Sequence, residues 1–157
     1  MSEKKRKAAA RPRTPTRPTP KPKETKPRAF EEKVEAAEVE LLPTKGTPGK
    51  GGGPGGRSWI IRAAGDRAGV IYVNVIDEPP VGKHPSIQIF LNKASQGRGI
   101  GRVAYRMASE ASGYEVIYAH MRKANVASRR AAEEAGYVDA SPPGFAQLIM
   151  KWKRRSR

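Results

Sequence analysis

Residues 95–113 read SQGRGIGRVAYRMASEASG, and this stretch is the strongest indication of the fold. Three glycines alternate with other residues at its start: Gly97, Gly99 and Gly101. A glycine-rich turn that opens a helix presents free backbone N–H groups, and the positive end of the helix dipole attracts anions. The spacing leaves two interpretations: a phosphate cradle, to which Arg98 and Arg102 add charge, or an ordinary structural turn.

The composition indicates an anionic partner. The 157 residues include 31 Lys or Arg and 15 Asp or Glu, a formal net charge of +16. Such a balance is typical of proteins that bind nucleic acid, phosphate-rich ligands or acidic surfaces. With no cysteine and two histidines, a metal site is not expected. No apolar run approaches the roughly 20 residues of a membrane span, and no apolar segment follows the basic N-terminus, so we expect a cytoplasmic protein without membrane contact.

Residues 1–57 differ in composition from the rest of the chain, and residues 1–28 carry eleven Lys or Arg against two Glu. Proline alternating with Lys, Arg and Thr cannot bury apolar surface, so we expect a disordered basic tail. The apolar residues of 29–42 have helical spacing and predict a short helix, which either docks on the domain or stays solvated. The glycine-rich residues 46–56 predict a flexible linker. The domain itself is expected at residues 58–157.

From residue 58 onward the pattern predicts strands and helices in the order β-β-β-α-β-α-β. Runs rich in Ile, Val, Tyr and Trp predict the strands, at 58–64, 69–77, 85–92, 114–121 and 145–153. Helices are predicted at 101–112 and 125–136, the second with Asn125 as N-cap and Gly136 as C-terminal stop. This order predicts an α+β fold, a mixed α/β layer structure.

Two motifs in this order resemble those of the GNAT superfamily of N-acetyltransferases. Residues 96–101 (QGRGIG) are similar to the Gln/Arg-x-x-Gly-x-Gly/Ala signature. Residues 125–137 (NVASRRAAEEAGY) are similar to the family's later motif, with an Asn, a small residue three positions on, a Glu, and a Gly before an aromatic residue. The resemblance implies a mostly antiparallel central sheet flanked by two helices. It also implies that this sheet is splayed between the strand before the glycine loop and the strand after it.

The resemblance further implies direct transfer of an acetyl group from acetyl-CoA to an amine, with coenzyme A as product. The residues implied in holding acetyl-CoA are Phe90, Leu91, Asn92, Gln96, Gly97, Arg98, Gly99, Ile100, Gly101, Arg102, Asn125 and Ser128. The amine is a peptide or protein N-terminus, a lysine or a small amine, with a basic protein or peptide among the candidates. The strand and two helices that wall the acceptor site in the family are not evident. Three alternatives follow: the domain is a minimal version, it borrows that wall from a second subunit in a homodimer, or it binds the cofactor without catalysing transfer.

The chain departs from the family pattern at both usual catalytic positions. The family's acidic tyrosine is replaced by Ala132, and its glutamate before the loop by Ser86. The remaining catalytic candidates are Ser128 and His84. The Asn-x-x-Ser form resembles the subgroup that acetylates N-termini of ribosomal proteins, in which such a serine assists the thiolate. Each candidate also has an ordinary interpretation: Ser128 as a helix residue bonding to the backbone, and His84 as an exposed loop residue.

Four further polar side chains are expected in the core: Tyr105, Tyr118, Tyr137 and His120. Two functions therefore remain open. The first is an acetyl-CoA-dependent N-acetyltransferase. The second is a catalytically degenerate GNAT-like protein whose basic tail and C-terminal residues 151–157 bind nucleic acid non-specifically through its phosphates.

Overall fold

The computed structural model describes residues 33–156. The fold described below belongs to the unit Glu31–Arg157. The predicted disordered tail and the start of the predicted helix at 29–42 lie outside the described residues. Among the helices of the described part, none is long and apolar enough to cross a membrane.

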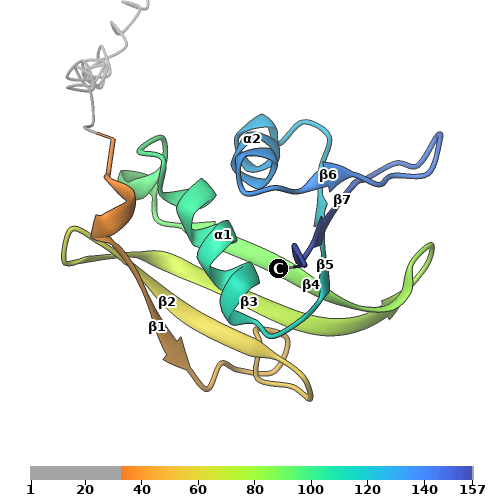
Figure 1. Cartoon of the computed structure of the whole chain (residues 1–157), viewed down its shortest axis with the longest axis horizontal. Helices are drawn as coiled ribbons and strands as arrows, with labels where there is room; N and C mark the ends of the chain where they lie inside the picture. Colours follow the sequence, from red (N-terminus) through yellow and green to blue (C-terminus); the bar gives the residue numbers. More distant parts are fainter. Residues whose placement is uncertain (1–32, 157) are drawn as a thin grey trace, which may run out of the picture. The chain divides into compact units, whose positions relative to one another are not determined.

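One mixed sheet organises this unit, with its strands in the order β1-β2-β3-β4-β5-β7-β6 (Figure 1). The strands are β1 (Val39–Thr44), β2 (Arg57–Ala63), β3 (Asp66–Glu78), β4 (Gly82–Leu91), β5 (Val116–Met121), β6 (Val138–Asp139) and β7 (Leu148–Lys153). Every neighbouring pair is antiparallel except β4 and β5, which run parallel. The predicted mostly antiparallel α+β fold is therefore confirmed.

Two helices, α1 (Ile100–Ala111) and α2 (Val126–Glu134), complete the unit (Figure 1). They lie where the sequence predicts them, in the two connections that flank β5. One buried cluster joins them to alternate residues of the strands: Trp59, Ile61, Ile71, Val73, Ile87, Ile117 and Ala119 pack with Ile100, Val103, Ala104, Ala108 and Ala132. Because side chains alternate along a strand, the residues between these core positions face the other side of the sheet.

The segment predicted as a short helix at 29–42 is different in the structure. A 3-10 turn, Ala36–Glu38, leads into β1, which pairs along its length with β2. Isolated short helices are marginal in water, whereas pairing with β2 satisfies the backbone of β1 and buries Val39. The Val34 N–H also donates to the Arg98 carbonyl at 2.9 Å, which joins this segment to the glycine loop. The N-terminal strand that the sequence did not reveal is thus present.

The glycine-rich residues 46–56, predicted to be a flexible linker, form a hydrogen-bonded loop between β1 and β2. The Gly51 N–H donates to Asn74 Oδ1 at 2.7 Å, and Asn74 Nδ2 donates to the Gly49 carbonyl at 2.7 Å. The Tyr114 hydroxyl donates to the Gly55 carbonyl. A Cβ at Gly51, where φ is +81°, would collide with the Arg57 carbonyl. These glycines therefore permit close backbone packing. In the order of the chain, this loop takes the place of the two helices that wall the acceptor site in the family.

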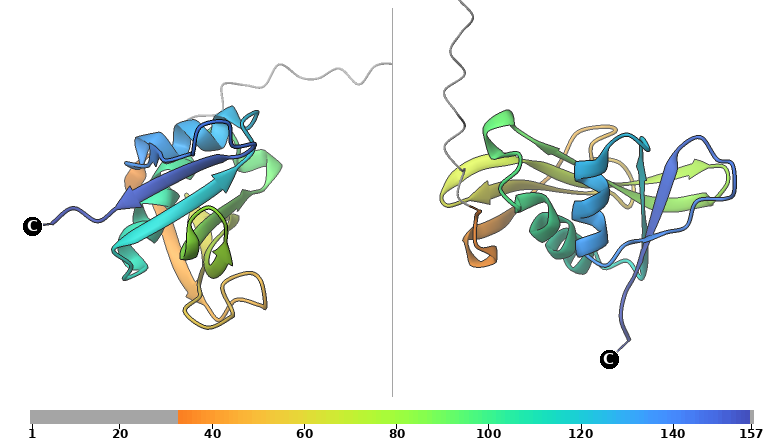
Figure 2. Two further views of the ribbon diagram at one scale, coloured as in Figure 1. Left: turned by 90° about the vertical axis from the view of Figure 1, so that its right-hand side faces the viewer. Right: turned by 90° about the horizontal axis from the view of Figure 1, so that it is seen from above.

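The C-terminal strands differ from the prediction in one respect. The strand predicted at 145–153 begins at Leu148, and the two-residue strand β6 pairs with its other edge. A strand of two residues has no periodicity that a sequence can reveal. Figure 2 shows β5 and β7 side by side, as their antiparallel register requires.

We expect Asn74→Ala to release the glycine-rich loop. The substitution leaves a backbone donor at Gly51 and an acceptor at Gly49 without their side-chain partner, which costs about 1–3 kcal/mol where such groups are buried. Urea denaturation should show the loss of stability, and amide hydrogen exchange should accelerate at residues 46–56. Lys50→Ala, an exposed substitution in the same loop, should change stability by less than about 0.5 kcal/mol. Unchanged exchange in Asn74→Ala would contradict this account of the loop.

Candidate active site

The site is built around the place where β4 and β5 separate. The two strands share a single register pair, Ser86 with Tyr118, and beyond it they diverge. A pocket of about 580 Å³ lies beside the last residues of β4, between α1 and α2. The residues that line it are Ile89, Phe90, Leu91, Gln96, Gly97, Gly99, Ile100, Gly101, Arg102, Tyr105, Asn125, Ala127, Ser128, Arg130, Ala131 and Glu134. The splay implied by the resemblance is therefore present, and a pocket lies beside it.

The glycine loop fits an anion at the mouth of α1. Gly97 and Gly99 have φ values of 75° and 77°, which favour glycine, and within the described residues no side chain caps α1. The first-turn N–H groups of α1 thus meet the pocket without a protein side chain as their acceptor. A Cβ at Gly101 would lie 3.4 Å from the Ala131 Cβ, so glycine at this position lets α1 and α2 approach closely.

Charged side chains stand at the rim of this pocket. Arg102 and Arg130 line it, and Arg102 Nη1 lies 3.6 Å from Glu134 Oε2. Both partners of this ion pair are about half exposed, at 44% and 57%, so the pair contributes little stability. Arg102 is consequently available to an anionic ligand that competes with Glu134.

Most of the residues predicted to hold acetyl-CoA line the pocket, and two do not. Asn92 instead fixes the turn after β4: its Oδ1 accepts from the Ser95 N–H at 3.0 Å, and its Nδ2 donates to the Arg67 carbonyl at 2.8 Å. The Arg98 carbonyl accepts the bond from Val34 described above. Asn92 and Arg98 therefore shape the glycine loop from outside the pocket.

At the other wall, Asn125 caps α2, because its side chain accepts a hydrogen bond from the Ser128 N–H at 3.2 Å. The Ser128 hydroxyl is hydrogen-bonded to Tyr105, a residue of α1 that also lines the pocket. Burial raises the pKa of Tyr105 to about 12, and the bond to Ser128 opposes this shift, so the phenol is protonated at neutral pH. Tyr105 is buried, as expected from the sequence, but its contact with Ser128 was not expected, since the two residues lie on different helices.

Tyr137 is a core residue, as expected. Its hydroxyl pairs with Ser109 Oγ at 2.6 Å, its ring meets the Tyr105 ring edge-on at 5.7 Å, and burial raises its pKa. Ala132 is fully buried, so the family's tyrosine position is part of the core. The Tyr105 side chain therefore packs against the aromatic ring of Tyr137.

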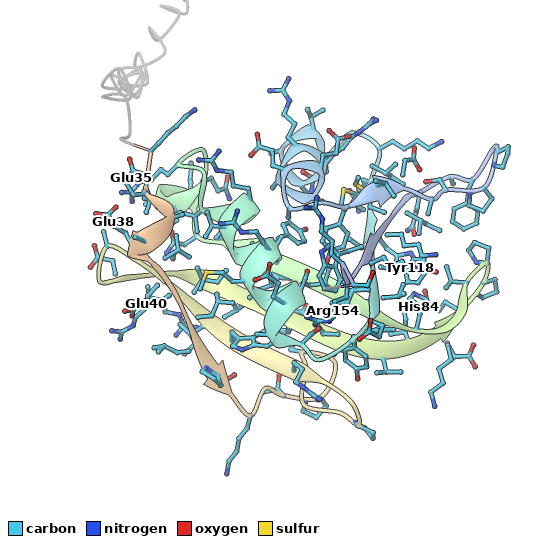
Figure 3. All side chains as sticks on the ribbon, viewed as in Figure 1. Glu35, Glu38, Glu40, His84, Tyr118 and Arg154 are labelled. Carbon is cyan, nitrogen blue, oxygen red and sulfur yellow. The ribbon has the colours of Figure 1, made fainter. Side chains whose placement is uncertain are left out.

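His84 is not an exposed loop residue, contrary to the expectation. It lies in β4 and is only 3% exposed. Its Nδ1 is 2.6 Å from the Gly82 carbonyl, and its Nε2 is 2.8 Å from His120 Nε2. The His84 ring meets Tyr118 edge-on with the centroids 5.1 Å apart (Figure 3). The proline-rich neighbourhood suggested a loop, but extended pairing with β3 runs through Pro85 and buries this ring.

His120 is half-buried rather than a core residue. Burial and the neighbouring His84 lower its pKa, while Glu78 acts in the opposite direction. Neither histidine lines the pocket between the helices. In the part of the chain that the structure describes, no three His, Asp or Glu side chains gather as a metal site would require.

Several solved structures share this fold at TM-scores slightly above 0.5. They include RimJ of Mycobacterium smegmatis in complex with CoA-disulfide, 18% identical, with 62% of this chain and 53% of that one covered and a TM-score of 0.52. The aminoglycoside acetyltransferase AAC(6')-Ib in complex with coenzyme A and kanamycin is 18% identical, with 64% and 67% covered and a TM-score of 0.54. The GNAT domain of Streptomyces lividans PAT is 13% identical, with 63% and 61% covered and a TM-score of 0.53.

The chain thus spans between about half and two thirds of the length of these structures. No curated protein sequence matches it significantly. The family described as "Acetyltransferase (GNAT) domain" matches residues 9–138, which is most of the chain. Together with the splayed sheet and the glycine loop at the head of α1, this match shows that the chain belongs to the GNAT acetyltransferase family.

Proposed function

We propose that this protein is an acetyl-CoA-dependent N-acetyltransferase. The observation that carries the proposal is the pocket of about 580 Å³ at the splay, which ends on the uncapped N-terminus of α1. An elongated anionic ligand matches such a slot, since backbone groups line its walls and positive charge stands at its mouth. The solved structures of RimJ and AAC(6')-Ib, which contain coenzyme A derivatives, support the same assignment by analogy.

The residues present fit acetyl-CoA. The first-turn N–H groups of α1, with Arg102 and Arg130 nearby, would hold the diphosphate. The end of β4, at residues 89–91, would offer backbone groups to the pantetheine amides, and Asn125 stands on the opposite wall. When bound, acetyl-CoA supplies a thioester whose carbonyl carbon accepts a nucleophilic amine.

On the chain's side, Ser128 is positioned to give a proton to a departing thiolate in this pocket. Its hydroxyl is bonded to Tyr105, whose raised pKa keeps the phenol protonated and able to replace that proton. Ala132, which is buried and apolar, cannot act in this way. We therefore assign Ser128 as the catalytic acid and Tyr105 as the residue that positions and reprotonates it.

Other expectations from the sequence stay predictions. They are a cytoplasmic location, a homodimer, non-specific nucleic-acid binding through the basic terminal segments, and an acceptor that is a peptide or protein N-terminus, a lysine or a small amine. The nucleic-acid alternative without catalysis keeps the same fold but has no need of a pocket that takes acetyl-CoA. Binding of acetyl-CoA is therefore the first experiment.

We expect acetyl-CoA to raise the melting temperature of the full chain by several degrees, because a ligand at 100 times its Kd stabilises by about 2.7 kcal/mol. Gly99→Asp should abolish this shift. Aspartate is among the residues that tolerate a φ of 77°, and it would place a carboxylate at the head of α1, where we place the diphosphate. Differential scanning fluorimetry with increasing acetyl-CoA measures both effects.

Gly113→Asp is the matched control. Its φ of 80° is equally positive, nothing lies within 4 Å of its Cβ position, and it follows the C-terminal end of α1. This variant should keep the full shift. The absence of any shift in the wild-type chain at millimolar acetyl-CoA would refute the proposed function and leave the nucleic-acid alternative.

We expect Ser128→Ala and Tyr105→Phe each to lower kcat about 10- to 100-fold, since general acid catalysis contributes about 10²-fold or more. The Kd of acetyl-CoA should change little, because both substitutions keep the pocket's shape. Non-additive effects in the double variant would identify the two hydroxyls as one unit. Tyr114→Phe, which removes a tyrosine hydroxyl that bonds to the Gly55 carbonyl, serves as the control and should retain kcat. Full activity in Ser128→Ala would exclude the assigned acid.

A further inference from the structure

Resting on the proposed function, we infer that His120, held by His84, is the base that takes the proton from the acceptor ammonium. The base acts from the face of the sheet opposite the two helices. A direct transfer needs such a group, because only the neutral amine is a nucleophile. The two histidines lie 36 positions apart in sequence and meet only through the fold.

The hydrogen bonds of the pair fix its tautomers. A carbonyl oxygen only accepts, so His84 Nδ1 must carry the hydrogen that points at the Gly82 carbonyl. A neutral His84 then has an unprotonated Nε2, and His120 Nε2–H is the donor of the 2.8 Å bond between the rings. The remaining nitrogen, His120 Nδ1, is therefore the one with a free lone pair. The pair has one basic atom, and it belongs to the more exposed ring.

The pair stands beside the point where β4 and β5 separate. His84 lies two positions before Ser86 in β4, and His120 two positions after Tyr118 in β5, the residues of the single register pair. All four alternate with the core residues Ile87, Ile117 and Ala119, so they share the face without helices. A base here would approach the slot from the side opposite the pocket between α1 and α2.

Ser86 gives a second, independent indication of a ligand on this face. It is 3% exposed, and within the described residues its Oγ is a buried side-chain atom without a hydrogen-bond partner. Leaving a buried hydroxyl unpaired costs about 1–3 kcal/mol, so such an atom indicates a missing partner. An acceptor amine, or the water that precedes it, supplies that partner next to the histidine pair.

The charges around His120 keep it neutral near physiological pH. Burial, and after it His84 on β4, lower its pKa from the ordinary value of 6.5, and Glu78 at the end of β3 partly offsets them. From β7, Lys151 Nζ lies 5.9 Å from the centroid of the Tyr118 ring on the same face. A neutral imidazole can accept a proton, whereas an imidazolium cannot.

The proton balance is complete. The ammonium gives one proton to His120 Nδ1, which yields a neutral amine and an imidazolium whose Nε2–H still donates to His84. The amine nitrogen then bonds to the acetyl carbon as the carbon–sulfur bond breaks. Sulfur takes the Ser128 proton, Tyr105 replaces it, and the second nitrogen proton returns to this pair of hydroxyls. His120 returns its proton to solvent. His84 touches no reactant and acts as a positioning residue.

The two histidines are the only ones in the chain, so an untagged, labelled full-length protein gives two imidazole signals. Long-range proton–nitrogen NMR should show His84 protonated at Nδ1 and His120 at Nε2 at pH 8. His120 should titrate below 6.5, because burial lowers its pKa. A His120 protonated at Nδ1 in the neutral protein would overturn the inference.

Kinetics supply the second readout. The release of thiol from acetyl-CoA is measured with three acceptors: spermidine, a peptide with a free N-terminus, and a lysine peptide with a blocked N-terminus. We expect kcat/KM to rise with pH through the His120 midpoint and to fall about 100-fold in His120→Gln, with the Kd of acetyl-CoA unchanged. Hydroxylamine, which is neutral at pH 7 and needs no base, should lose much less. Lys83→Gln, on the same strand but the other face, is the control and should keep the wild-type profile.

These results separate the inference from the proposed function. If acetyl-CoA binds and His120→Gln retains the rate and the pH dependence of the wild type, the base is wrong while the proposed function stands. If acetyl-CoA fails to stabilise the wild-type chain, the proposed function fails and this inference fails with it. If no amine in the panel releases thiol, the NMR results test the inference. His120 protonated at Nε2 with a midpoint below 6.5 supports it, and His120 protonated at Nδ1 overturns it.

Stability should follow the same protonation. The folded pKa of His120 lies below 6.5, so the unfolded chain binds more protons at pH values between the two, and the free energy of unfolding falls as pH drops through this window. Urea midpoints at pH 8 and pH 5.5 should differ in this direction. The difference should shrink in His120→Gln; an equal difference in that variant would exclude His120 as its source.

Discussion

The structure depends on the very short parallel pairing between β4 and β5. β4 and β5 meet at a single register position, Ser86 with Tyr118, in a sheet whose other contacts are antiparallel. Backbone groups at the end of β4 are therefore turned toward a gap, and such groups need partners. Gln96 satisfies one of them, since its Nε2 donates to the Leu91 carbonyl at 3.2 Å. The rest of that strand end is available to a ligand, and the helices on either side of β5 form the walls.

The N-terminal part of the described chain completes the sheet with very few residues. β1 covers the outer edge of β2, and a loop at 45–56 returns directly to β2. Hydrogen bonds with Asn74 and Tyr114 hold that loop, so it packs closely although seven of its twelve residues are glycine. A connection this short brings no helix onto the face that carries the histidine pair.

The site divides its chemistry between the two faces of the sheet. On the helix side, an uncapped helix terminus and arginines suit an anionic ligand, and the Tyr105–Ser128 bond places a protonated hydroxyl pair in the same pocket. On the other side lie the hydrogen-bonded pair of His84 and His120 and, among the described residues, the buried Ser86 hydroxyl without a hydrogen-bond partner. Burial acts on both sides: it lowers the pKa of His120, and it raises the pKa of Tyr105 to about 12, so that this phenol stays protonated at neutral pH.

By itself, the sequence determined the features that depend on neighbouring residues. The glycine loop before α1, the Asn125 cap of α2 and the apolar alternation of β2 to β5 are all local preferences of the backbone, and each could be predicted. Only the tertiary structure decided the features that join distant segments. It made an edge strand of residues that have helical spacing, because β2 offered hydrogen bonds that an isolated helix lacks. It also brought Tyr105 to Ser128 and His84 to His120, since contacts between separate elements depend on packing and leave no periodic signal in the chain.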